Sequence, residues 1–350
     1  MYLSNFLGPL SLTPAHDGPM IDLCLRQAEE SAAAGFAMVT FGEQHLNGYE
    51  PYSDPFLMAA RLAPVLGDCW FGTTIVPLPL RPVLRLAEHA AIIDYLLKGR
   101  FLLGVSAGRG GPVPEFKVFG VDQNDRPAAF DSKLGLLQAI FAHQPGDPPL
   151  DLNTPWDTGT LIGRLMPTPY RKGGPQIAVG TNTPEKIDAI ARQGLPLFLG
   201  PCLPHVAAGL LARHRDGLAA AGHSAEVIAD ATVKSLVTRH VIVGATSEQA
   251  WERAERLAGR NPMMDRTTDT RSLRELSTAD VSDRNAAHVQ SWIIAGNPDE
   301  VTEQIQAYAD AEVQHLNVRF TVGASLPSDV DASFALFRDE VLPALKPQRF

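Results

Sequence analysis

Residues 36–47 read Phe-Ala-Met-Val-Thr-Phe-Gly-Glu-Gln-His-Leu-Asn, a compact and mostly apolar run that ends in a polar cluster. The first six residues have the composition of a parallel strand that is buried on both faces. In a (β/α)8 barrel, the catalytic groups lie at the C-terminal ends of the strands. Glu43, Gln44 and His45 are therefore candidate catalytic residues. The alternative is an ordinary polar loop.

Similar apolar segments recur along the chain and alternate with helix-like stretches. We expect eight strands, at residues 2–7, 36–41, 70–76, 101–105, 176–180, 196–199, 235–243 and 315–320. Three helices should begin alike, at Asp54-Pro55, Thr183-Pro184 and Asn297-Pro298, because a side-chain oxygen can cap the helix while proline occupies its first position. Strand–helix alternation predicts a parallel sheet. Eight repeats favour a closed (β/α)8 TIM barrel over an open sheet.

The length suits one large domain. With 350 residues, 45% of them hydrophobic, the chain can form a single barrel over residues 1–350. Two stretches break the rhythm, at about 144–175 and 259–290, after the fourth and seventh strand–helix units. Long insertions are usually functional or disordered. The second one is either a lid over the barrel mouth or a solvated surface excursion.

Charge and cysteine content exclude several classes of function. The chain has 30 basic and 39 acidic residues, a net charge of −9, and no basic cluster, so we expect no nucleic-acid or membrane partner. The first residues lack the pattern of a signal peptide or an anchor, which favours the cytoplasm. Cys24, Cys69 and Cys202 are too few and too scattered for a disulfide framework or a zinc site, and we expect no metal.

Two strand ends have the composition of anion sites. The glycine-rich stretch 104–112 lacks the third glycine of the dinucleotide fingerprint, and Pro112 interrupts the helix that would follow. It is either a loop that brings Arg109 to an anion or a tight turn with a solvated arginine. After the fifth strand, Gly180, Thr181 and Thr183 precede a helix N-terminus, where free N–H groups favour negative charge. An ordinary capped helix is the alternative.

Several short matches occur in a specific order. They are Ser4-Asn5-Phe6-Leu7, Gly35-Phe36 before Glu43-Gln44-His45, Leu86-Ala87-Glu88, Lys98-Gly99-Arg100-Phe101, residues 115–122, Gly194-Leu195-Pro196, residues 295–301 and Glu340-Val341-Leu342-Pro343. In this order and spacing, the chain resembles the bacterial luciferase-like family of flavin-dependent monooxygenases over nearly its whole length.

The resemblance implies a barrel with reduced FMN across its C-terminal mouth. In this family oxygen adds to the flavin as a C4a-peroxide, which oxidises a small organic substrate such as an aldehyde or ketone. A non-proline cis peptide often ends the third strand beneath the flavin ring, and Thr74 lies in the matching region. Ser106 matches a position near the reactive face of the flavin.

The resemblance also implies a phosphate site. Arg109 matches the family's phosphate-binding arginine if a short insertion precedes it, whereas an ungapped alignment places Ala107 there. Gly180, Thr181 and Thr183 match the family's second phosphate-contacting turn, and we assign their neighbours Val179 and Asn182 to the same cofactor-binding turn.

One departure concerns the polar cluster. The family commonly has Glu-His-His, but Gln44 stands where the first histidine would be, and glutamine cannot titrate near neutral pH. Either His45 transfers the proton, or Gln44 only orients a ligand, or the barrel does no oxygenation.

Three functions follow from these observations. The first is a two-component FMN-dependent monooxygenase, a homodimer that receives reduced FMN from a separate flavin reductase, since the chain has no nicotinamide fingerprint. The second is a non-catalytic flavin-binding or heterodimer subunit. The third is a deazaflavin-dependent hydride-transfer enzyme on the same fold.

Walls for such a site need apolar side chains, because reactive flavin chemistry must be shielded from water. The sequence offers Phe6, Phe41, Trp70 and Ile75 on strands, and Trp292 beneath the second insertion.

Overall fold

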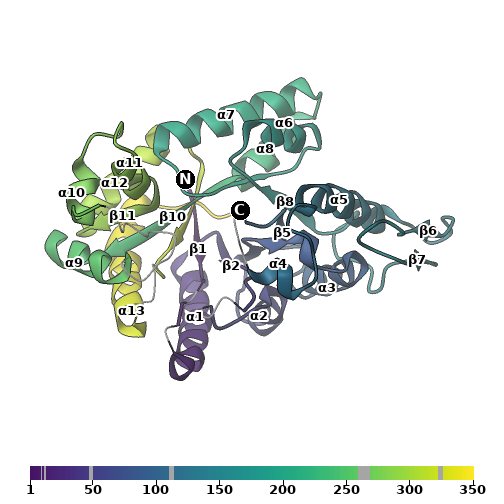
Figure 1. The fold of residues 1–350 in the computed structure, drawn as a ribbon, viewed down its shortest axis with the longest axis horizontal. Coiled ribbons are helices and arrows are strands. Elements are labelled where there is room, and N and C mark those ends of the chain that lie inside the picture. The colour runs from purple at the N-terminus through teal and green to yellow at the C-terminus, as the bar shows by residue number, and fades with distance from the viewer. Residues whose placement is uncertain (9, 12, 47–49, 110–113, 259–268, 322–325) are drawn as a thin grey trace.

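The strands close into a barrel. The computed structural model describes residues 1–8, 10–11, 13–46, 50–109, 114–258, 269–321 and 326–350. Eight parallel strands pair side by side around the ring, and the last one pairs with the first (Figure 1). They are β1 (Tyr2–Phe6), β2 (Met38–Phe41), β3 (Trp70–Thr73), β5 (Phe101–Ser106), β8 (Gln176–Gly180), β9 (Leu197–Leu199), β10 (Leu236–Val243) and β12 (His315–Arg319). The expected (β/α)8 TIM barrel is confirmed.

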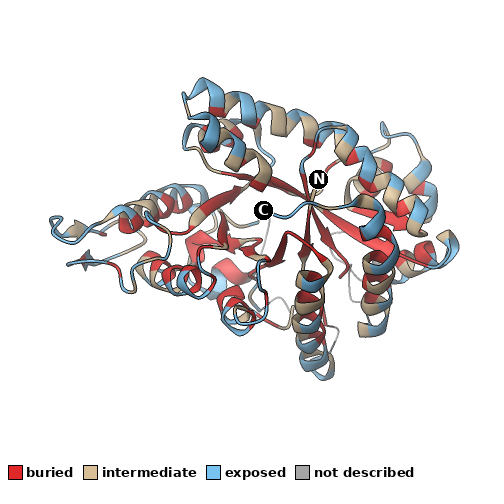
Figure 2. Cartoon of the chain, turned by 180° about the vertical axis from the view of Figure 1, so that it is seen from behind, coloured by how far each residue is buried: buried red, intermediate tan, exposed pale blue. Residues whose placement is uncertain are grey.

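Helices surround the strands. Figure 2 shows buried strands enclosed by helices whose outer faces are exposed. The helices are α1 (Pro14–Ala34), α2 (Pro55–Leu62), α3 (Val83–Leu96), α4 (Pro114–Val118), α5 (Arg126–Ala142), α6 (Pro184–Arg192), α7 (Pro204–Ala220), α8 (Ala225–Lys234), α9 (Ser247–Ala258), α10 (Leu273–Thr278), α11 (Arg284–Trp292), α12 (Pro298–Asp310), α13 (Pro327–Leu336) and α14 (Leu342–Leu345).

The three expected helix starts are present, with one difference in capping. Asp54 and Asn297 cap α2 and α12 through their side chains. Thr183 occupies the capping position of α6, but its hydroxyl makes no capping hydrogen bond. Its backbone N–H instead donates to Thr181 Oγ1 at 3.1 Å. The N-terminus of α6 therefore has no side-chain cap.

Several elements differ from the expectation. The third strand ends at Thr73, and a cis peptide between Thr74 and Ile75 separates it from β4 (Val76–Pro77). An additional strand, β11 (Ile293–Gly296), pairs with the C-terminal half of β10. A four-residue apolar run is too short for periodicity to distinguish a strand from a helix.

Both insertions contain structure. The first carries the hairpin of β6 (Leu150–Asp151) and β7 (Thr160–Leu161), which projects beyond α3 and α5 (Figure 1). Of the second, residues 259–268 lie outside the described part. The remainder forms α10 and α11, which bury Leu273, Leu276 and Ala286 in a small cluster with Ile242 of β10. This described remainder packs on the barrel and is not a solvated excursion.

Three further findings concern the described residues alone. None of their helices has the length and apolar character needed to span a bilayer. Cys24, Cys69 and Cys202 are buried free thiols. No group of three or more His, Cys, Asp or Glu side chains is arranged there to hold a metal ion.

Gly104 is required by the crowded barrel interior. A Cβ atom at this position of β5 would overlap the carbonyl oxygen of Thr73 and lie 2.6 Å from the ring of Phe198. Because backbone cannot move aside cheaply, we expect Gly104→Ala to destabilise the protein by roughly 3 kcal/mol. Gly135→Ala is the matched control, since α5 is open there, and alanine should stabilise it by about 0.5–1 kcal/mol. Chemical denaturation of both variants measures the contrast, and equal effects would contradict it.

His315 predicts an acid-sensitive barrel. Its Nδ1–H donates to Val233 O and its Nε2 accepts from the hydroxyl of Ser4, so the ring is neutral and buried. Burial lowers the pKa of His315 to about 3. The unfolded chain, with a histidine pKa near 6.5, binds more protons between these values, so stability falls as the pH drops through this window.

From pH 6.5 to 4.5 this histidine should remove roughly 2–3 kcal/mol of unfolding free energy. We expect His315→Asn to flatten the pH dependence of the unfolding free energy by that amount, while His205→Asn, at an exposed position on α7, leaves it unchanged. A wild-type slope in His315→Asn would refute this assignment.

Candidate functional site

The ends of four neighbouring strands bring most of the candidate residues together. The N–H of Thr74 donates to Phe41 O at 2.8 Å, and a Cβ atom at Gly42 would lie 3.1 Å from Thr74 O. A Cβ atom at Gly180 would overlap Ile75 and lie 3.8 Å from the Cβ of Ser106. The ends of β2, β3, β5 and β8 therefore form one continuous rim at the C-terminal end of the barrel.

A buried ion-pair network holds the polar cluster after β2. Glu43 Oε1 lies 2.8 Å from His45 Nε2. Arg81 binds the same carboxylate with both ends of its fork, Nε at 2.9 Å and a terminal nitrogen at 2.8 Å, and reaches Asp54 at 3.0 Å. The Glu43 side chain is fully buried. Since a carboxylate paired with arginine only accepts, His45 Nε2 donates to Glu43, and Nδ1 has no hydrogen bond to the described residues.

The surroundings of His45 join this network to the loop after β5. The backbone N–H of His45 donates to Glu115 Oε2 at 3.5 Å, and Phe119 lies against the imidazole with ring centroids 4.7 Å apart. Burial raises the pKa of Glu115, while the hydrogen bond from the backbone N–H of His45 and the charge of Arg109 oppose that rise. Glu115 therefore lies near both the histidine and the expected phosphate arginine. Gln44, between Glu43 and His45, is exposed.

The rim offers features that fit a flavin. Thr74 is 8% exposed, and its hydroxyl is buried without a hydrogen-bond partner among the described residues. The cis peptide expected from the resemblance follows it directly. The side chain of Ile75 fills the space beside Gly180. A buried hydroxyl without a partner suits a ligand that brings its own hydrogen-bonding edge.

The expected phosphate contacts lie on adjoining loops. Ala107 is half-buried, Gly108 has a φ of 82°, and Arg109 is exposed. After β8, Thr181 and Thr183 frame the uncapped start of α6. Asn182 accepts a hydrogen bond from Gly200 N–H at 2.8 Å and so joins this turn to the loop after β9. The side chain of Val179 packs in the main core, which leaves only its backbone for a cofactor.

A second guanidinium lies at the loop after β5. Arg126, at the start of α5, donates to Gly108 O at 3.2 Å, and its Nε is buried without a partner in the described chain. Nothing in the sequence distinguished Arg126, because Asp-Arg-Pro is an ordinary helix start. The sequence also did not predict roles for Arg81 and Glu115, because each lies far along the chain from the residue that it contacts.

Two of the expected wall residues lie elsewhere. Trp70 begins β3, at the N-terminal end of the barrel, where its ring contacts Phe350 and Lys234. Phe41 is fully buried and stacks on Phe71 in the core between strands and helices. Both assignments were wrong. Trp70 lies at the opposite end of its strand from the barrel mouth, and a run buried on both faces does not show which face Phe41 takes.

The other three wall residues lie at the C-terminal end. Phe6 lies under the Arg319 guanidinium at 4.6 Å, Ile75 lies against Gly180, and Trp292 stacks on His240.

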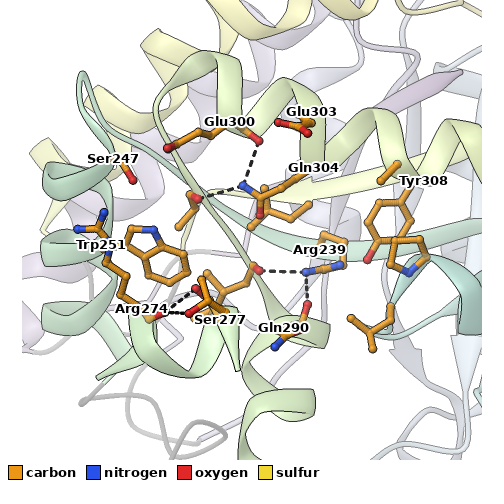
Figure 3. Close-up of a pocket in the computed structure, with 17 residues that line it drawn as sticks. Arg239, Ser247, Trp251, Arg274, Ser277, Gln290, Glu300, Glu303, Gln304 and Tyr308 are labelled. Atoms are coloured by element: carbon orange, nitrogen blue, oxygen red, sulfur yellow. Dashed lines mark hydrogen bonds between the residues drawn. The ribbon is translucent and has the colours of Figure 1, made fainter. Parts of the chain in front are cut away.

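A separate pocket of about 540 Å³ lies on the outer side of β10, between α7, α10 and α12. Figure 3 shows Arg239 in this pocket, with bonds to the carbonyl oxygens of Gln290 and Ile293 at 2.7 and 3.0 Å. Burial lowers the pKa of Arg239 to about 9, so the group stays a cation at neutral pH. The pocket contains none of the candidate residues. Arg239 joins α11 to the start of β11.

Comparison with known proteins agrees with this geometry. Residues 3–315 match the family model described as luciferase-like monooxygenase. Protein y4vJ of Sinorhizobium fredii is 37% identical over 124 residues, covering 34% of this chain and 35% of its own. The 4-hydroxyprotoasukamycin monooxygenase of Streptomyces nodosus subsp. asukaensis is 30% identical over 179 residues, covering 50% and 46%. The matches therefore span a third to a half of these relatives.

Solved structures share the fold over nearly the whole chain. The monooxygenase RslO1 of Streptomyces bottropensis has a TM-score of 0.79 at 22% identity, covering 98% of this chain and 99% of its own. The oxygenating constituent of 3,6-diketocamphane monooxygenase from Pseudomonas putida, in complex with FMN, has 0.74 at 17%, covering all of both chains. An F420-dependent secondary alcohol dehydrogenase has 0.71 at 15%, covering 98% of both.

The family model covers most of the chain, and the barrel, its cis peptide and its polar rim agree with that match. The chain belongs to the luciferase-like family of flavin-dependent monooxygenases.

Proposed function

We propose that the protein is an FMN-dependent monooxygenase that oxidises a small organic substrate, such as an aldehyde or ketone, with O₂. A separate reductase supplies reduced FMN. Bound reduced flavin would supply the electrons that activate oxygen. The observation that carries the proposal is the buried Arg81–Glu43–His45 network beside a rim that fits a flavin phosphate and ring.

Each residue has a defined part in this proposal. Glu43 fixes His45 through Nε2, so the imidazole can take up or release a proton at Nδ1. Arg81 holds the Glu43 carboxylate in place. Thr74 and Ser106 would border the flavin ring, whereas Ala107, Arg109 and the turn from Val179 to Thr183 would hold its ribityl phosphate.

Two other functions differ in measurable ways. A flavin-binding or heterodimer subunit would bind FMN without turnover. Gln44 favours this alternative, because it replaces the titrating group of the common family pattern. A deazaflavin-dependent hydride-transfer enzyme would bind that cofactor in preference to FMN, and a structural neighbour is an F420-dependent dehydrogenase.

An anaerobic titration with reduced FMN, and in parallel with a reduced deazaflavin, separates these functions. We expect tighter binding of FMN, oxygen uptake coupled to oxidation of a carbonyl substrate, and little NADH consumption unless a reductase is added. Preference for the deazaflavin, or rapid NADH oxidation by the protein alone, would overturn the proposal. We also propose that the protein is a homodimer, which light scattering of the purified protein tests. We propose a cytoplasmic location as well.

A further inference from the structure

His240 lies inside the C-terminal end of the barrel. Along β10, Leu236 belongs to a small cluster inside the barrel, and Thr238 accepts a hydrogen bond at 3.5 Å from Asn317 on the neighbouring strand β12. Because side chains alternate along a strand, His240 faces the same way. Its partner in the register is Arg319, near the C-terminal end of β12. The imidazole therefore lies one inward-facing position beyond the polar pair Thr238 and Asn317, toward the C-terminal end of the barrel.

Trp292 covers one face of this imidazole. It is the last residue of α11, and the two rings are parallel within 10°, with centroids 5.1 Å apart. Trp292 is half-buried, whereas His240 is 3% exposed. The second insertion thus supplies an aromatic wall beside β10 at this end of the barrel.

The charged groups near His240 leave it neutral. Burial, and then the positive charges of Arg319 and Arg239, lower the pKa of His240 well below its ordinary value. Arg319 is itself paired with Glu50 at 3.3 Å and donates to Gly8 O at 2.6 Å. Arg239 binds backbone carbonyl oxygens on the outer side of β10. This part of the site therefore has a neutral imidazole beside an arginine, Arg319, whose charge is balanced by Glu50.

The imidazole of His240 lacks a hydrogen-bond partner among the described residues. Its Nδ1 is buried and makes no hydrogen bond to them. A buried polar atom without a partner costs about 1–3 kcal/mol, so a partner from outside the chain would be favoured. Neutral imidazole presents Nδ1 as a donor or as an acceptor according to its tautomer. A hydroxyl group pairs with either form, and a carbonyl oxygen pairs with the donor form.

We propose that His240 is the hydrogen-bonding contact for an uncharged substrate that carries a hydroxyl or carbonyl oxygen, and that Trp292 forms the adjoining apolar wall. An anionic substrate is disfavoured there, because Arg319 is already paired with Glu50. This inference rests on the proposed function, since it assigns the substrate side of the same strand-end site.

Three probes of one shape test the inference. They are 2-naphthol, 2-methylnaphthalene, which replaces the hydroxyl by a methyl group, and 2-naphthoate, which is an anion. Equilibrium dialysis gives their dissociation constants. We expect the wild-type protein to bind naphthol roughly three- to tenfold more tightly than methylnaphthalene, as one neutral hydrogen bond provides, and naphthoate more weakly than naphthol.

Two variants at His240 separate the hydrogen bond from the packing. His240→Asn keeps a polar atom near the Nδ1 position and should retain the preference for naphthol. His240→Phe keeps the ring against Trp292 and should reduce the ratio to about one. His214→Asn is the control, because His214 is also buried but bonds Leu195 O outside the barrel. Trp292→Leu should weaken all three probes by a similar factor, and this variant remains informative if His240→Phe does not fold.

A hydroxyl preference that survives in His240→Phe, a wild-type preference for naphthoate, or no wild-type binding of any probe would overturn the inference. The affinity for reduced FMN is measured separately on the same variants and should not change. A wild-type protein that binds naphthol selectively but not FMN would refute the proposed function alone.

Discussion

Replacement of His45 by alanine is expected to lower turnover by roughly 10²–10⁴-fold, the usual contribution of a positioned acid or base. The physical reason is the fixed geometry of the imidazole. Glu43 holds Nε2 at 2.8 Å, and Arg81 holds Glu43 with both ends of its fork. The remaining nitrogen is the atom that can exchange a proton. The measurement is substrate-dependent oxygen uptake with saturating reduced FMN.

Gln44→Ala is the matched control, one residue away on the same loop and exposed. It should act more mildly, through lost orientation alone. Reduced FMN should bind both variants as it binds the wild-type protein, which separates a lost proton transfer from a lost cofactor. Full activity of His45→Ala on a productive substrate would show that the acid/base assignment is wrong. A large loss in Gln44→Ala alone would move the role to the amide.

The sequence predicted the barrel because its signal is repeated. Each buried strand is a short apolar run. Eight such runs alternating with helices all indicate the same fold, even where a predicted strand boundary is wrong by one or two residues. The strand β11 was missed because Ile293–Gly296 is short and directly follows α11. A run of four apolar residues is too short for its periodicity to distinguish a strand from a helix.

The site was predictable only where its residues are adjacent in sequence. Glu43 and His45 follow one strand, so their proximity could be inferred. Arg81 reaches Glu43 from the segment that follows β4, and His240 meets Trp292 only because α11 returns to β10. These contacts depend on tertiary packing that no local pattern encodes. Trp70 illustrates the opposite error, since the first residue of a strand lies at the N-terminal end of the barrel, away from the C-terminal mouth.

Loss of Arg109 is expected to weaken FMN binding by roughly ten- to a hundredfold and to change riboflavin binding far less. Hydrogen bonds to charged groups contribute about 1.5–3 kcal/mol in favourable settings. Arg109 follows β5 and the Thr181–Thr183 turn follows β8, and these strands are paired neighbours in the barrel. A phosphate between the two loops would receive the guanidinium, two hydroxyls and the N–H groups of the uncapped α6 start.

Riboflavin carries the flavin ring without the phosphate, so the contrast between the two ligands tests the phosphate site and not the fold. Arg126→Ala is the comparison variant, because Arg126 supports the same loop through Gly108 O. If Arg109→Ala weakens both ligands equally, Arg109 only supports the loop. If Arg126→Ala alone weakens FMN selectively, the phosphate lies at Arg126 and the assignment of Arg109 is wrong. Titration of each variant with both flavins, followed by fluorescence quenching, decides between these results, since only a direct phosphate contact can distinguish FMN from riboflavin.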